Sequence, residues 1–185
     1  MAPALLLLLP SSACSGEGGD GSEDDGSPGT SAKDLPQVET ETTVDKVSGQ
    51  LDERGRAKVK QGVNAAVDQW FDEAFLGEFP RTDYSAAFAG FTRGAQEDAE
   101  RDLDLMSNAR ISDQIETAVA VNRRVRLNVL APQGQPRGAT ARFVLDFTTT
   151  GELAGDRRVI GSLYLSKQLG EWRVFGYDVL EAMAR

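Results

Sequence analysis

The feature that most constrains the fold of this chain is an alternation of apolar and polar residues between positions 139 and 180. From Ala141 to Thr148 the odd positions are apolar and the even positions are mostly polar. Successive side chains of a β-strand point to opposite faces, so this period predicts a strand with one apolar face. The same period predicts a second strand over 158–166. The apolar positions of the two strands are Ala141, Phe143, Leu145, Phe147, Val159, Leu163 and Leu165.

A third strand is predicted from Trp172 to Leu180, after a short link whose Gly170 suits a hairpin. A strand with apolar residues on both faces is typical of one that is central or covered on both sides. Simple alternation places Trp172 and Val174 on one face, and Phe175, Tyr177 and Val179 on the other.

An amphipathic helix is predicted from Ala57 to Leu76, where Gly77 and Pro80 end it. Two shorter helices are predicted over 84–91 and 95–106. The acidic face of the last helix is interpreted as a solvated surface rather than a cation site, because arginines are interspersed with its carboxylates. The apolar stripe of the long helix comprises Val59, Val63, Ala66, Val67, Trp70, Phe71, Ala74 and Phe75.

A further strand is predicted between Ile115 and Leu130, and Arg123 interrupts its apolar face. A β-bulge, which shifts the register by one residue, or a position at the sheet edge is the favoured explanation. A side chain that enters a cavity to meet an anion is the alternative. A hairpin loop rich in Gly and Pro is predicted over 132–138. A second loop, rich in Gly, is predicted over 150–156.

The first 14 residues resemble a bacterial lipoprotein signal. Leu5 to Leu9 form an apolar stretch too short to span a bilayer, and Ser12-Ala13-Cys14 fits the end of a lipobox. The resemblance implies lipidation of Cys14, export across the cytoplasmic membrane and an extracytoplasmic lipid anchor. An ordinary signal peptide with an incidental Cys14 is the alternative.

Residues 15–50 are predicted to be a disordered acidic tether. They contain nine acidic residues and two lysines, a net charge of −7, and they lack the apolar content that would offset the entropy of ordering the chain. Binding of a basic partner or of calcium is the alternative to a solvated spacer. Residues 51–185 are predicted to form one folded domain, whose near-neutral charge does not resemble a nucleic-acid-binding surface.

The absence of histidine and the single cysteine exclude several kinds of site. A Ser-His-Asp triad and a histidine-based zinc site both need an imidazole. One cysteine forms neither an intrachain disulfide nor a metal cluster. No metal site and no cofactor are therefore predicted.

The element order and the closing Trp172-Arg173-Val174 resemble the nuclear transport factor 2-like superfamily, in particular its mammalian-cell-entry-associated (Mce-associated) members. The resemblance covers about residues 55–182 and includes the turn Phe88-x-x-Phe91-Thr92. It implies an α+β cone in which N-terminal helices pack on a curved antiparallel sheet of about four strands, preceded by a disordered tail. This fold hosts enzymes, binders and structural modules, so the fold alone does not give the function.

The sequence is compatible with two functions. The favoured one is a non-catalytic module that binds a partner or an apolar small ligand, accessory to an envelope complex. The alternative is an enzyme similar to polyketide cyclases or ketosteroid isomerases, with a tyrosine beside a buried carboxylate such as Asp146 or Asp178. The superfamily also implies a homodimer through the sheet. The candidate pocket residues are Trp70, Phe71, Phe75, Tyr84, Phe88, Tyr164, Trp172, Tyr177 and Asp178. Core packing is the simplest interpretation of Trp70, Phe71 and Phe75, because a core wall and a pocket wall use the same residues.

Overall fold

A six-stranded sheet dominates the computed structural model, which describes residues 38–180. The main strands follow the order β1-β3-β4-β5-β6, and the short β2 (Gly77–Glu78) pairs with β3 off this path. Strand β1 runs parallel to β3, and every other pairing is antiparallel. The bounds of the five long strands are β1 (Glu41–Gly49), β3 (Thr117–Ala131), β4 (Gly138–Thr149), β5 (Gly155–Gln168) and β6 (Glu171–Leu180).

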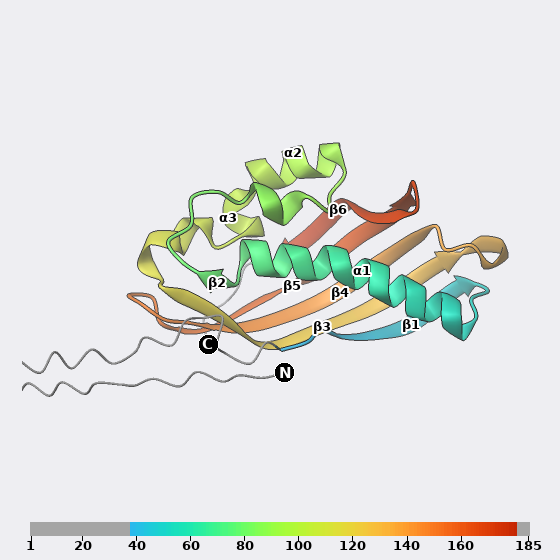
Figure 1. The fold of residues 1–185 in the computed structure, drawn as a ribbon, viewed down its shortest axis with the longest axis horizontal. Coiled ribbons are helices and arrows are strands. Elements are labelled where there is room, and N and C mark those ends of the chain that lie inside the picture. Colours follow the sequence, from blue (N-terminus) through green and yellow to red (C-terminus); the bar gives the residue numbers. More distant parts are fainter. Residues whose placement is uncertain (1–37, 181–185) are drawn as a thin grey trace, which may run out of the picture.

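The helices gather on one face of this sheet (Figure 1), which we call the inner face; the opposite one is the outer face. Helix α1 (Glu53–Ala74) crosses the strands, and α2 (Arg93–Arg101) and α3 (Leu103–Met106) lie over the side nearer β6. Residues 38–180 also contain three short 3-10 turns: η2 (Ser85–Phe88), η3 (Ala109–Gln114) and η4 (Pro132–Gly134). The predicted helix over 95–106 is thus two helices, and the one over 84–91 is a single 3-10 turn.

The predicted fold class is wrong in its sheet and in its disordered tail. The sheet has six strands rather than about four, and it is mixed rather than antiparallel, because β1 joins the edge of β3 in parallel. Residues 41–49 were assigned to the tether, yet they form β1. Strand β1 has little apolar surface of its own, since only Thr42 in it is buried. Its order comes from pairing with β3, which composition does not reveal.

The long helix α1 supplies the centre of the core. Its N-cap Asp52 accepts a hydrogen bond from the backbone N–H of Gly55 at 2.7 Å, which satisfies one of the otherwise unpaired donors of the first turn. The predicted apolar stripe is confirmed: all eight of its residues are buried. Each large side chain of this kind contributes about 1.5–3 kcal/mol when it is fully buried. The stripe packs on the inner face, for example where Trp70 meets Phe143 of β4 with ring centroids 5.1 Å apart.

A bulge in β3 decides where Arg123 points. The pairing with β4 shifts between Ala120 and Asn122, so Val121 is the extra residue and is 61% exposed. Beyond the bulge Arg123 pairs with Leu145 and shares the inner face with it. There it forms an ion pair with Asp72 of α1. The bulge favoured from the sequence therefore occurs, two residues before Arg123, and this arginine pairs with a carboxylate of α1.

A second bulge corrects the assignment of faces in β6. The register with β5 shifts between Tyr164 and Leu165, and Phe175 is the residue left without a partner in this pairing. Tyr177 lies opposite the fully buried Leu163 and therefore shares the inner face with Trp172 and Val174. Simple alternation had placed Tyr177 on the other face, because it cannot detect an inserted residue.

Candidate functional site

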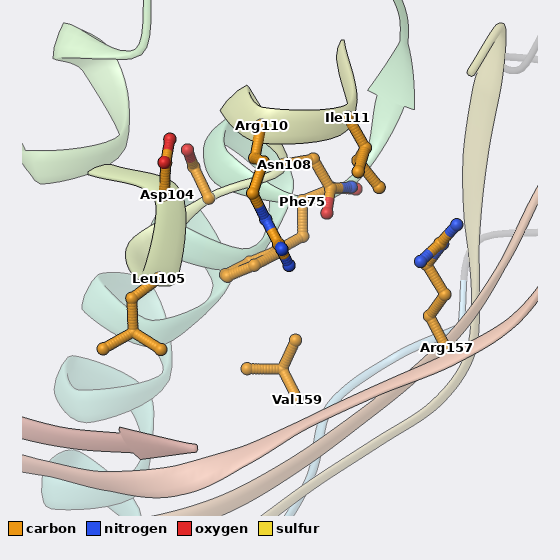
Figure 2. A pocket seen from close by; sticks show the side chains of 9 residues that line it. Phe75, Asp104, Leu105, Asn108, Arg110, Ile111, Arg157 and Val159 are labelled. Atoms are coloured by element: carbon orange, nitrogen blue, oxygen red, sulfur yellow. The ribbon is translucent and has the colours of Figure 1, made fainter. Parts of the chain in front are cut away.

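A hollow of about 40 Å³ opens between the α3–η3 segment and the start of β5. Figure 2 shows the side chains that surround it, with Val159 of β5 on one side and the side chains of η3 on the other. The lining of the hollow comprises Phe75, Asp104, Leu105, Ser107, Asn108, Arg110, Ile111, Arg157 and Val159.

Hydrogen bonds to α1 hold the helical wall of this hollow in place. The side-chain amide Nδ2 of Asn108 donates to the carbonyl of Phe75 at 2.7 Å, and its backbone N–H donates to Ala74 at 3.0 Å. These carbonyls belong to the C-terminal end of α1, where the helix itself offers no donors. The indole Nε1 of Trp70 donates to the carbonyl of Met106 at 3.0 Å. The wall is therefore fixed by buried polar contacts and not by apolar packing alone.

Two guanidinium groups border the hollow. Arg157 lies on the inner face beside Val159, and its Nε and Nη2 donate to Thr149 Oγ1 at 3.3 Å and to the carbonyl of Leu153 at 3.1 Å. In Figure 2 the side chain of Arg110 extends from η3 toward Val159, whereas the carboxylate of Asp104 points away from the hollow. The rim of the hollow therefore carries two guanidinium groups above an apolar floor.

The size of the hollow limits what it can hold. One water-sized group needs about 10–15 Å³ of such a hollow, so 40 Å³ accommodates a few heavy atoms. Phe75 and Val159 are each 2% exposed and form its apolar part. A short aliphatic group fits this space, whereas a fused ring system does not.

The predicted pocket aromatics of the helices lie in the packed core. Trp70, Phe71, Phe75, Tyr84 and Phe88 are each at most 5% exposed. Trp70 contacts Phe71 and Phe75 with ring centroids 5.4 and 5.3 Å apart, which leaves no ligand-sized space between these rings. Of the five, only Phe75 lines the hollow.

The other predicted pocket residues are spread over both faces of the sheet. Trp172 is buried against Gly62 of α1, and Tyr164 is 36% exposed on the outer face. Tyr177 lies on the inner face, where its hydroxyl donates to Asp102 Oδ2 at 2.8 Å. Burial is the main cause that raises the pKa of the Tyr177 phenol. The hydrogen bond to Asp102 and the negative charge of that carboxylate raise this pKa further. Asp178 is exposed on the outer face, so the structure does not bring it together with Tyr177.

Asp146, the other candidate acid, also lies on the outer face. It accepts hydrogen bonds from Arg158 Nε at 2.5 Å and from Asn122 Nδ2 at 2.8 Å. The hydrogen bond from Arg158 is the main cause that lowers the pKa of this carboxyl, against the opposing effect of burial. A carboxylate stabilised in its charged form is a weak base, and this one faces away from the hollow.

Two further hollows meet at Trp172. A groove of about 480 Å³ lies between α1 and the β5–β6 turn, with small residues such as Gly62 and Ala66 in its wall. A smaller hollow of about 160 Å³ lies beside Leu51 and Lys167. Neither of them has a tyrosine in its lining, so neither brings a carboxylate together with a tyrosine hydroxyl.

The sequence analysis predicts no site role for Arg110, Asn108 or Arg157. For Arg157 a signal existed: it shares odd numbering with Val159, Leu163 and Leu165, which places it on the apolar face of the predicted strand. For Arg110 and Asn108 no periodic signal existed, because the η3 turn that carries them has no repeating pattern.

Residues 38–180 contain neither a group of metal-ligating side chains nor a helix that could span a membrane. Within that range no three histidine, cysteine, aspartate or glutamate side chains are grouped so that they could hold a metal ion. None of the helices in the same range is both long enough and apolar enough to cross a bilayer.

Comparison with known proteins leaves the resemblance as a prediction. No protein-family model matches the chain, and no curated protein matches its sequence significantly. The function must therefore be argued from the geometry of the site.

Proposed function

We propose that this chain is an extracytoplasmic lipoprotein, anchored through Cys14, whose folded domain binds a small apolar ligand and does not catalyse a reaction. The observation that carries the proposal is the hollow between η3 and β5, where apolar side chains of Phe75, Ile111 and Val159 meet at a fixed opening. Concave, largely apolar sites with a few placed polar groups are the usual form of small-molecule sites.

The dispersal of the candidate catalytic groups supports a binding role. An enzyme of the alternative type needs a carboxylate and a tyrosine hydroxyl that converge on one reacting atom. Here Tyr177 and Asp178 point to opposite faces of β6, and Asp146 is held by Arg158 on the outer face. The resemblance to nuclear transport factor 2-like proteins and a role accessory to an envelope complex are part of the same proposal.

An interaction through the outer face is the second candidate. Phe175 is 55% and Leu180 57% exposed there, and Phe175 lies beside Tyr164 with ring centroids 6.4 Å apart. Exposed aromatic side chains of this kind are enriched at protein interfaces. A homodimer through the sheet would cover them.

Native mass spectrometry of the full-length chain, released from detergent, tests both candidates. A retained small molecule that is lost in Ile111→Trp, which fills the hollow, supports ligand binding. Ile160→Trp is the matched control, because Ile160 is equally half-buried but lies on the outer face. A small molecule that survives Ile111→Trp, or a chain that never carries one, would contradict the ligand role. A dimer that only Ile160→Trp disrupts would favour the second candidate.

A further inference from the structure

We infer that the ligand of the hollow is a short organic anion, with its carboxylate on the guanidinium groups of Arg157 and Arg110 and its aliphatic chain between Phe75 and Val159. This inference rests on the proposed function, and it adds the chemical class of the ligand. The charge and the orientation of the side chains around the hollow, together with the volume of the hollow, support this ligand class.

Arg157 lies in an unusual environment. This side chain is half-buried, and within residues 38–180 no carboxylate forms an ion pair with it. Its two hydrogen bonds go to neutral acceptors, the hydroxyl of Thr149 and the carbonyl of Leu153. The other half-buried arginines of the strands are Arg123, Arg158 and Arg173, and each of these pairs with a carboxylate. A partly desolvated cation that has no anionic partner favours the binding of an anion.

The guanidinium group of Arg157 is held in one orientation by its hydrogen bonds. Thr149 is 1% exposed, and its hydroxyl donates to the carbonyl of Leu153 at 2.7 Å, so the acceptors around the guanidinium are themselves fixed. Bonds from Nε and Nη2 set the plane of the guanidinium group and leave further N–H donors at its edge. A guanidinium that is oriented in advance binds a planar carboxylate with little loss of side-chain freedom.

The hollow is divided into a polar rim and an apolar floor. Figure 2 shows Arg157 and Arg110 on two sides of the opening and Val159 below Arg110, with the Asp104 carboxylate directed elsewhere. A ligand that satisfies both parts carries its charge at one end and a few carbon atoms at the other. The volume of about 40 Å³ restricts the enclosed part to a chain of about three or four carbons.

A pair of ligands of matched length tests the inference. Butyrate and 1-butanol share the aliphatic chain and differ in charge, and their binding to the full-length chain is measured by NMR chemical-shift titration. We expect butyrate to bind roughly tenfold or more tightly than butanol, since hydrogen bonds between charged groups are about twice as strong as neutral ones. Arg157→Gln should remove this preference.

The control variant is Arg142→Gln, which removes an exposed arginine from the outer face of β4 and should leave the preference unchanged. Arg110→Gln, a change at an exposed position, should weaken butyrate binding even where Arg157→Gln reduces the folded fraction. Equal binding of butyrate and butanol, or a preference that survives both Arg157→Gln and Arg110→Gln, would overturn the anion inference and leave the proposed ligand-binding role intact. Failure of both ligands to bind at the hollow would overturn both.

Discussion

Arg123 of β3 and Asp72 of α1 form an ion pair between residues 51 positions apart in the sequence. Only 11% of the arginine side chain is exposed, against 51% of the aspartate, and Asp68 lies 3.9 Å from the same guanidinium. A polar stripe on α1, formed by Asn64, Asp68 and Asp72, thus receives an arginine from the sheet. Thr42 and Thr40 of the β1 region bond to Asn64 and Asp68 on the same stripe.

Removal of this arginine should destabilise the fold and change the titration of Asp68. Burial raises the pKa of the Asp68 carboxyl, while the hydrogen bond from Thr40 and the charge of Arg123 oppose the rise. Arg123→Met should therefore raise this pKa further, and it should cost about 1–2 kcal/mol of unfolding free energy after allowance for the exposure of Asp72. Carboxyl-carbon NMR titration and urea denaturation measure the two effects. An unchanged pKa of Asp68 would show that the pair does not act as the geometry indicates.

Gly62 should resist replacement by alanine although it lies inside a helix. Alanine usually stabilises an exposed helix interior by about 0.8–1 kcal/mol relative to glycine. A Cβ at Gly62, however, would lie 2.5 Å from Trp172 Cδ1, so the indole would have to move. We expect Gly62→Ala to destabilise by about 1–3 kcal/mol in thermal or urea denaturation. Gly94→Ala in α2 is the control, because nothing lies within 4 Å of its Cβ, and it should be neutral or stabilising.

The β5–β6 turn contains an unfavourable residue at Leu169. Its φ of 51° and that of Gly170, 93°, are the left-handed values of a two-residue hairpin turn, and the side chain is fully exposed. Asparagine tolerates this conformation better than other non-glycine residues. Leu169→Asn should raise the free energy of unfolding by about 0.5–1 kcal/mol. Leu169→Ala keeps the strain and should give no such gain; equal gains from both variants would assign the effect to the exposed leucine instead.

The Asp146–Arg158 pair should contribute to stability at neutral pH and lose that contribution in acid. The pKa of Asp146 is lowered in the folded state, so its contribution is present above the unfolded pKa of about 3.9 and declines as the pH falls through the folded value. Arg158→Met should reduce stability at pH 7 and flatten its decline below about pH 4. Urea denaturation across pH 2–7 compares the variant with the original chain. Parallel curves would contradict the assignment.

Cys14→Ala tests the anchor. If Cys14 carries a lipid, the variant should move from the membrane fraction to the soluble fraction, because the signal stretch Leu5–Leu9 is too short to span a bilayer. Cell fractionation with immunoblotting measures the distribution. Cys14 lies outside the described residues, and an unchanged distribution would reject the lipoprotein part of the proposal.

The parts of the fold that could be predicted from the sequence are those with a strong period. The apolar stripe of α1 and the odd positions of β4 are buried as expected, because apolar residues that repeat with the period of a helix or a strand form the face that packs in the core. Strand β1 could not be predicted, since its polar side chains are ordered by the backbone hydrogen bonds of β3 rather than by their own burial. The interruption of the apolar pattern at Arg123 indicated the bulge found at Val121, whereas no such signal marked the bulge at Phe175. One inserted residue reverses every later face without changing the composition.

The candidate site was less predictable than the fold. Aromatic residues that pack in a core have the same composition as those that line a pocket, and only the three-dimensional packing of Trp70 and Phe71 distinguishes the two. The hollow forms instead where the irregular α3–η3 segment approaches β5, through residues such as Arg110 and Asn108 that follow no period.

The parallel pairing of β1 with β3 also has a consequence for the order in which the domain assembles. Strands β3 to β6 are joined by short hairpins and can pair as soon as each is available, whereas Asp45 of β1 must meet Arg126, 81 residues later. Contacts so distant in sequence form slowly, because a long loop has to close first. We therefore expect β1 to join last and to exchange its amide hydrogens soonest, so that a chain emerging from its N-terminus holds this strand unpaired until β3 has appeared.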